Sequence, residues 1–195
     1  MSISAISSKL RPLICGAGVL LFGAFPSALH AQLSLDEALR AAFPAPTTIE
    51  RRTAFLQPEE LETARAQAGR DVPMTQRIVT YYLAREKGNP IGVAYFDSHR
   101  VRTLNEVVMV VVTPRDRIRT IEVLRFAEPP EYHASKPWLD QFRDQALTER
   151  LSLKGDIRNL SGATLTSNAI AKAARRVLAL HGRIQPFRSA SRTSP

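Results

Sequence analysis

A run of small and hydroxyl-bearing residues near the C-terminal end has the composition of an anion-binding turn. The run SGATLTS (161–167) is followed by residues 168–180, whose apolar members have helical spacing. The first backbone N–H groups of a helix lack intrahelical acceptors, and the helix dipole places positive charge at that end. Glycine lets the backbone approach an anion closely. The run therefore predicts a phosphate site at a helix start, formed by Ser161, Gly162, Ala163, Thr164, Leu165, Thr166 and Ser167.

The hydroxyl groups of this run suggest chemistry beyond simple anion binding. A threonine hydroxyl is a poor nucleophile unless a neighbouring group or another enzyme activates it. The plainer interpretation is a capped helix start, in which Thr166 and Ser167 bond the first N–H groups.

Residues 161–166 (SGATLT) resemble the S/T-G-A-T flavinylation motif of the FMN-binding domain family. That family includes periplasm-facing flavin subunits of sodium-pumping and Rnf-type electron-transfer complexes. In it, a flavin transferase uses FAD to attach FMN to the final threonine of the motif through a phosphoester. The resemblance implies that Thr164 carries covalent FMN, and Thr166 is the alternative acceptor.

The resemblance extends in organisation over residues 77–180, with one departure. Family members often have an acidic residue three positions before the motif serine. This chain has Arg158 there, and Asp156 is the nearest acid. The departure bears on whether a transferase recognises the site.

The segment before the motif offers a surface for the flavin ring, which needs a flat apolar wall and a few polar contacts. A loop with the sequence EPPEY (128–132) and an aromatic short helix (138–142) resemble family features in the same order. The candidate ring contacts are Glu128, Pro129, Tyr132, Trp138 and Leu139. Tyr132 and Trp138 could stack on the ring. Core packing is the alternative for Trp138 and Leu139, and an exposed loop carboxylate is the alternative for Glu128.

Helices and strands that could position these residues are visible in the sequence pattern. Helices are predicted over 34–42, with a capping box, and over 58–68, with a proline near its first position. Residues 78–84 and 91–96 form a predicted hairpin, followed by a strongly apolar strand at 106–113 and another strand at 118–126. A short helix starts near residue 136, and the long helix of 168–180 ends at Gly182. Consecutive strands joined by short turns indicate an antiparallel sheet, hence an α+β fold with flanking helices in a single domain, similar to the FMN-binding domain.

The N-terminus has the pattern of a cleaved secretory signal. Lys9 and Arg11 precede an uncharged apolar run at 12–25, and small residues lead to a cleavage site after Ala31. The run is short for a membrane span, so an uncleaved anchor is the lesser alternative. We expect a signal peptide (1–31), an N-terminal helical segment (32–76), an FMN-binding domain (77–182) and a basic flexible tail (183–195).

Charge and cysteine content narrow the functional classes. The 195-residue chain carries a net charge of +9, which falls to +7 when Lys9 and Arg11 leave with the signal. Such a charge favours an anionic membrane surface or an acidic partner, with a generally soluble basic surface as the plainer interpretation. Nucleic acid is a poor candidate for an exported protein. The one cysteine, Cys15, also leaves with the signal, which excludes disulfides, iron–sulfur clusters and thiol catalysis.

These observations predict an exported, periplasmic flavoprotein with FMN on Thr164, and they leave peripheral membrane association open. We expect a flavin transferase to mature it and a membrane redox protein to exchange electrons with it. It would then pass electrons to another carrier or a reductase. We therefore expect an electron-transfer flavoprotein rather than a stand-alone enzyme. No metal site is predicted. The alternatives are a sensor or binding module that holds FMN or another anion without an ester, and a purely structural domain.

Overall fold

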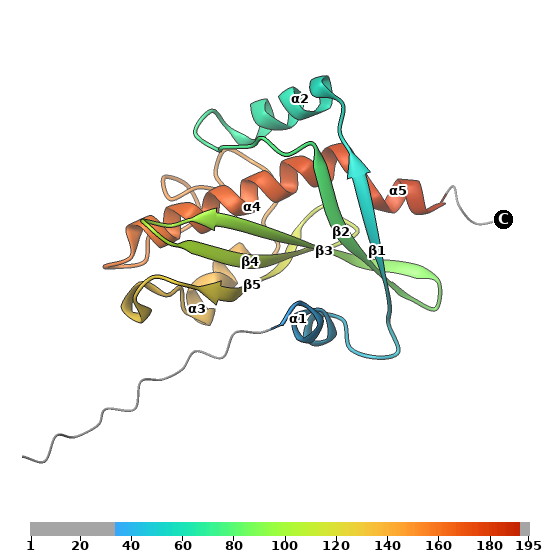
Figure 1. Ribbon diagram of the computed structural model, residues 1–195, viewed down its shortest axis with the longest axis horizontal. Coiled ribbons are helices and arrows are strands. Elements are labelled where there is room, and N and C mark those ends of the chain that lie inside the picture. Colours follow the sequence, from blue (N-terminus) through green and yellow to red (C-terminus); the bar gives the residue numbers. More distant parts are fainter. Residues whose placement is uncertain (1–33, 192–195) are drawn as a thin grey trace, which may run out of the picture. The chain divides into compact units, whose positions relative to one another are not determined.

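A five-stranded antiparallel sheet forms the centre of the fold. The computed structural model describes residues 34–191, so the predicted signal peptide and residues 192–195 lie outside the described residues. The strands follow one another in the sheet in chain order. They are β1 (Thr48–Phe55), β2 (Ile78–Glu86), β3 (Asn89–Arg100), β4 (Asn105–Val112) and β5 (Ile118–Phe126) (Figure 1). The predicted α+β class is confirmed, and so are the hairpin and the two strands that follow it.

Helices cover both faces of the sheet (Figure 1). They are α1 (Leu35–Ala42), α2 (Pro58–Ala68), α3 (Lys136–Leu139), α4 (Thr164–Ile184) and α5 (Pro186–Ser191), with 3-10 turns η1 (Pro130–Tyr132) and η2 (Asp140–Phe142). The capping box of α1 is present, because Ser34 and Glu37 bond each other's backbone N–H groups. In the described part of the chain, no helix is long and apolar enough to span a membrane.

The alternation of side chains along the strands divides the core into two layers. On one face, Tyr95 and Val110 pack with Val177 of α4 in a cluster that also includes α2. On the other face, Met109 packs with Phe43, at the end of α1. A Cβ at Gly92 would lie 2.9 Å from the Phe43 ring, so the ring packs against the sheet here because residue 92 has no side chain.

Strand β1 was not predicted, and the expectation of a purely helical segment before residue 77 is wrong. β1 pairs with β2 from Thr48 opposite Arg85 to Phe55 opposite Ile78. It is an edge strand with mostly exposed or half-buried side chains. Its charged centre, Glu50, Arg51 and Arg52, therefore hides the apolar alternation by which strands are recognised.

Helix α4 is longer than predicted at both ends. It begins at Thr164 rather than near residue 168, and it passes Gly182 to end at Ile184. Gln185 then adopts a left-handed conformation, with φ 47°. Part of the predicted tail is folded, because α5 follows and the Phe187 ring packs 5.4 Å from the His181 ring.

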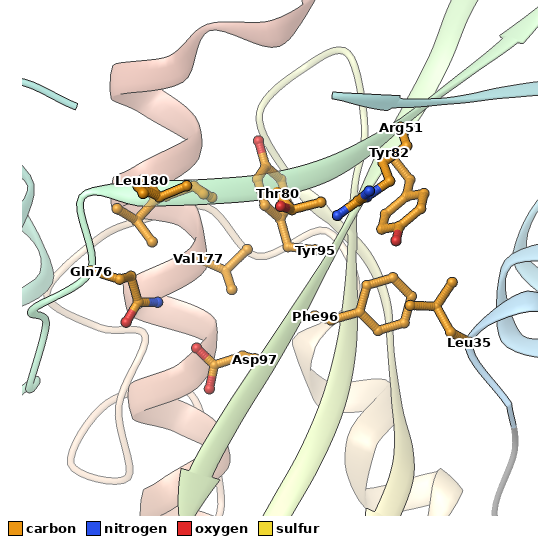
Figure 2. Close-up of a pocket in the computed structure, with 12 residues that line it drawn as sticks. Leu35, Arg51, Gln76, Thr80, Tyr82, Tyr95, Phe96, Asp97, Val177 and Leu180 are labelled. Atoms are coloured by element: carbon orange, nitrogen blue, oxygen red, sulfur yellow. The ribbon is translucent and has the colours of Figure 1, made fainter. Parts of the chain in front are cut away.

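The sheet opens between β2 and β3. These strands pair only from Tyr81 opposite Tyr95 towards their connecting turn, whereas β3 continues to Arg100 in contact with β4 alone. A cavity of about 350 Å³ fills the resulting fork, between Thr80 and Phe96 and beside Val177 of α4 (Figure 2). None of the predicted flavin-binding residues lines it.

Candidate functional site

A second cavity, at the start of α4, is lined by the predicted motif. Its volume is about 310 Å³, and the motif residues that line it are Gly162, Ala163, Thr164, Leu165 and Thr166. Arg102, from the turn between β3 and β4, and Tyr132, from η1, line it as well. Three segments far apart in the sequence therefore meet at this cavity. We assign the candidate site here rather than to the fork between β2 and β3, because the motif for which the sequence predicts a phosphate site lies here.

The turn before α4 leaves the start of the helix without a cap. The Ala163 N–H donates to Leu160 O at 3.0 Å, and Gly162 has φ 80°, a conformation that favours glycine. Ala163 occupies the N-cap position, and no side chain caps the helix from it. The N–H groups of the first turn are consequently available to an anion, which the helix dipole also attracts.

Thr164 and Thr166 differ sharply in exposure. Thr164 is exposed, and its Oγ1 lies 2.8 Å from Asn159 Nδ2. Thr166 is only 1% exposed, and its Oγ1 is buried with no hydrogen-bond partner among the described residues. A buried hydroxyl without a partner costs free energy unless a ligand satisfies it. Since both residues line the cavity, Thr166 offers a contact for a bound group and Thr164 offers an accessible nucleophile.

Ser167 does not face the cavity. Its hydroxyl accepts a hydrogen bond from the Leu160 N–H at 3.0 Å and donates one to Ala163 O at 3.1 Å. The Ser167 N–H also donates to Ala163 O at 3.0 Å. The hypothesis that Thr166 and Ser167 cap α4 is therefore wrong. Ser167 instead fixes the turn that precedes the helix.

Glu128 has a structural contact in place of the predicted flavin contact. Its Oε1 accepts hydrogen bonds from the N–H groups of Arg102, Thr103 and Leu104, at 3.1, 2.7 and 2.8 Å. Bonds from Leu104 and Thr103 are the largest cause of a Glu128 pKa below its usual value. The carboxylate is 7% exposed and does not line the cavity. It holds the β3–β4 turn in the shape that places Arg102 at the site.

Arg102 is the site residue that the sequence analysis missed. Its guanidinium carbon lies 5.1 Å from the centre of the Tyr132 ring, a cation–π geometry. Together these side chains form a wall opposite the motif, with a positive charge and an aromatic face. Two aliphatic side chains lie in the same segments, Leu165 in the motif at 50% exposure and Leu104 in the turn at 46%. Such exposed leucines suit contact with a flat apolar ring.

Trp138 and Leu139 are core residues, which corrects their proposed contact with the ring. Both are buried, and Trp138 packs against Phe142 with ring centroids 5.4 Å apart. The Trp138 Nε1–H donates to Arg158 O at 2.7 Å. Trp138 thus supports the segment that leads into the motif. Pro129 and Ser161 are exposed and do not line the cavity, so of the predicted ring contacts only Tyr132 reaches it.

A buried charged chain lies below the β3–β4 turn. Arg176 of α4 bonds both carboxylate oxygens of Asp97, at 2.7 and 2.6 Å. His99 bridges Asp97 and Glu106, with both ring nitrogens 2.9 Å from a carboxylate oxygen. Burial lowers the pKa of His99, but hydrogen bonds to Asp97 and Glu106 outweigh it and raise the pKa to about 9. His99 and Glu106 thus join β3 to β4 at the base of the turn that carries Arg102.

The residues at the cavity fit a phosphorylated flavin. An uncapped helix start and the unpartnered Thr166 hydroxyl suit phosphate oxygens. Arg102, Tyr132 and Leu165 supply charge, an aromatic face and apolar surface for the remainder of the ligand. No group of three or more histidine, cysteine or acidic side chains suited to a metal occurs among residues 34–191.

Comparison with known proteins agrees with this assignment. No curated protein matches the chain significantly. The model of the FMN-binding domain family matches residues 105–179, from the start of β4 through most of α4. Arg102 lies three residues before the matched segment. Residues 105–179, which include Tyr132 and the motif at the start of α4, match the FMN-binding domain family.

Proposed function

We propose that this protein is an exported electron-transfer flavoprotein that carries FMN as a phosphoester on Thr164. The observation that carries the proposal is the contrast at the start of α4. Thr164 presents an exposed hydroxyl, and Thr166 presents a buried, unpartnered one to the same cavity. The first is accessible to a modifying enzyme, and the second suits a contact with the phosphate that is attached.

The attachment is a phosphoryl transfer that needs a flavin transferase and FAD. The Thr164 Oγ1–phosphorus bond forms at the FMN phosphorus, and the bond from that phosphorus to the AMP oxygen breaks. AMP leaves with the electron pair, and the hydroxyl proton passes to a base of the transferase or to water. The transferase and its metal ion activate the reaction, since no base lies against Thr164 in the described chain.

The chain's own residues would then bind and orient the cofactor. N–H groups of the first turn and the Thr166 hydroxyl suit the phosphate, and the Arg102 guanidinium adds positive charge. Tyr132 and Leu165 line the cavity and would provide surface for the ring. FMN supplies one- and two-electron redox chemistry when bound, and the protein sets its exposure and electrostatic surroundings.

Export and partners are part of the same proposal. A signal at residues 1–31 would direct the chain to the periplasm, where a covalent bond prevents loss of the cofactor. A membrane redox protein would supply or accept its electrons, and another carrier or reductase would be the second partner. The cavity at Thr164 opens at the surface, which suits exchange with a docked protein.

The proposal is tested by co-expression with a flavin transferase, followed by a denaturing gel viewed for flavin fluorescence. The wild-type chain should give a fluorescent band, and Thr164→Ala should not. Cell fractionation of the same cultures tests export, with the band expected in the periplasm. A colourless wild-type band would contradict covalent attachment.

A non-covalent FMN site is the second candidate, and Arg158 favours it. Its exposed side chain stands where family members often have an acidic residue. On this alternative, the native protein is yellow and releases all its flavin on denaturation.

A further inference from the structure

Asn159 contacts the proposed acceptor threonine from outside the motif. Its Nδ2 lies 2.8 Å from Thr164 Oγ1, and both side chains are exposed. The contact spans the turn from Leu160 to Ala163, which the Ala163 N–H closes by bonding to Leu160 O. Among the described residues, Asn159 is the one side chain that forms a hydrogen bond with the Thr164 hydroxyl.

The backbone on the N-terminal side of Asn159 is held in place. The Trp138 Nε1–H donates to Arg158 O at 2.7 Å, and the Arg158 N–H donates to Gln141 Oε1 at 2.9 Å. Ile157, one residue earlier, is fully buried in the main core. Both backbone polar groups of Arg158 are therefore satisfied by residues of the α3–η2 segment.

The backbone on the C-terminal side is held as well. The Leu160 N–H donates to Ser167 Oγ at 3.0 Å, and that hydroxyl donates to Ala163 O at 3.1 Å. Asn159 thus projects from a segment anchored at both neighbours. An exposed threonine hydroxyl in a first helical turn can otherwise occupy more than one χ1 rotamer.

We propose that Asn159 orients the Thr164 hydroxyl for flavin attachment, an inference that rests on the proposed function. The Asn159 Nδ2–H donates to one lone pair of Thr164 Oγ1 and selects one rotamer. The second lone pair and the hydroxyl proton remain accessible to the transferase. An amide cannot take the proton, so Asn159 aligns the nucleophile, and the proton still leaves to the transferase or to water.

The test is the initial rate at which a purified flavin transferase, with FAD and Mg²⁺, labels the exported chain. Asn159→Ala should lower kcat about tenfold, the value of one ordinary hydrogen bond, with an unchanged KM for the protein substrate. Asn159→Asp should not restore the rate, since a carboxylate has the same size but no N–H to donate to Thr164 Oγ1. Asn168→Ala is the matched control. Asn168 is an exposed asparagine in α4, four residues after Thr164, and its replacement should leave the labelling rate at the wild-type value.

A second measurement reads the contact without flavin. In the unlabelled protein, the Asn159 side-chain amide resonances should shift in Thr164→Val and stay in place in Thr166→Val. Equal labelling rates for the wild type and Asn159→Ala, or an effect confined to KM, would overturn the role of Asn159 and leave the proposed function standing. A wild-type chain that takes up no FMN would overturn the proposed function, and this inference with it.

Discussion

Thr164 and Thr166 lie two residues apart in the first turn of α4 and line the same cavity, yet one hydroxyl is exposed and the other is buried without a partner. Because each helical residue is turned by about 100° from the one before it, the two side chains leave the helix in directions about 160° apart and meet the cavity differently. Thr164 is therefore the threonine that the proposed transferase would reach. It also gives each threonine a separate, measurable role.

Thr166→Val should stabilise the unlabelled protein and weaken its affinity for FMN. Valine fills the same space and removes an unsatisfied hydroxyl, so the free energy of unfolding should rise by about 1 kcal/mol. Urea denaturation measures the stability, and quenching of free FMN fluorescence measures the affinity. The exposed Thr164→Val is the control and should leave stability unchanged. A less stable Thr166→Val with wild-type FMN affinity would show that the hydroxyl serves the core.

Arg102→Ala should weaken FMN binding about tenfold, because it removes a cation from the cavity wall and the contact with the Tyr132 ring. Fluorescence titration of the unlabelled protein with FMN measures this change. Arg100→Ala is a suitable control, since Arg100 is exposed and does not line the cavity. Equal losses in both variants would indicate a general effect of net charge.

Much of this arrangement could be predicted from sequence, because the motif and its helix are contiguous. The run 161–167 identifies a helix start, and β-branched, aromatic and apolar runs identify β2 to β5. Arg102 could not be found in this way. It lies about 60 residues before the motif in a short turn, and only the packing of α4 along β3 brings it to the cavity. Nothing local distinguishes it from the other exposed arginines.

Trp138 and Glu128 show why the ring contacts were harder to predict. Their residue types suit a flavin site as well as a structural role. The choice depends on whether a carbonyl or a set of N–H groups lies within reach. Arg158 O satisfies Trp138, and the β3–β4 turn satisfies Glu128. Both partners are set by tertiary structure.

Trp138→Phe should destabilise the fold without changing the flavin. The loss of the bond to Arg158 O should cost about 1 kcal/mol in the free energy of unfolding, while the phenyl ring retains contact with Phe142. Flavin absorption and fluorescence of the labelled protein should match the wild type. Tyr132→Leu serves as the comparison, since loss of an aromatic wall should raise flavin fluorescence. A large spectral change in Trp138→Phe would place that ring against the cofactor after all.

Deprotonation of His99 should lower the free energy of unfolding at alkaline pH. Its pKa of about 9 in the folded protein lies above the ordinary value of 6.5. A raised pKa adds stability that is complete below pH 6.5 and is lost as the pH rises through 9, by at most about 3 kcal/mol. Urea denaturation at several pH values between 6.5 and 9.5 measures the decline. His99→Gln should flatten it, and an equally steep decline in that variant would assign the titration to another group.

The most direct test of the central claim is the intact mass of the exported protein after co-expression with a flavin transferase. We expect a gain of one FMN less one water in the wild type and in Thr166→Val, located by peptide mapping on Thr164, and no gain in Thr164→Val. An unchanged wild-type mass, or an adduct that persists in Thr164→Val, would contradict the account.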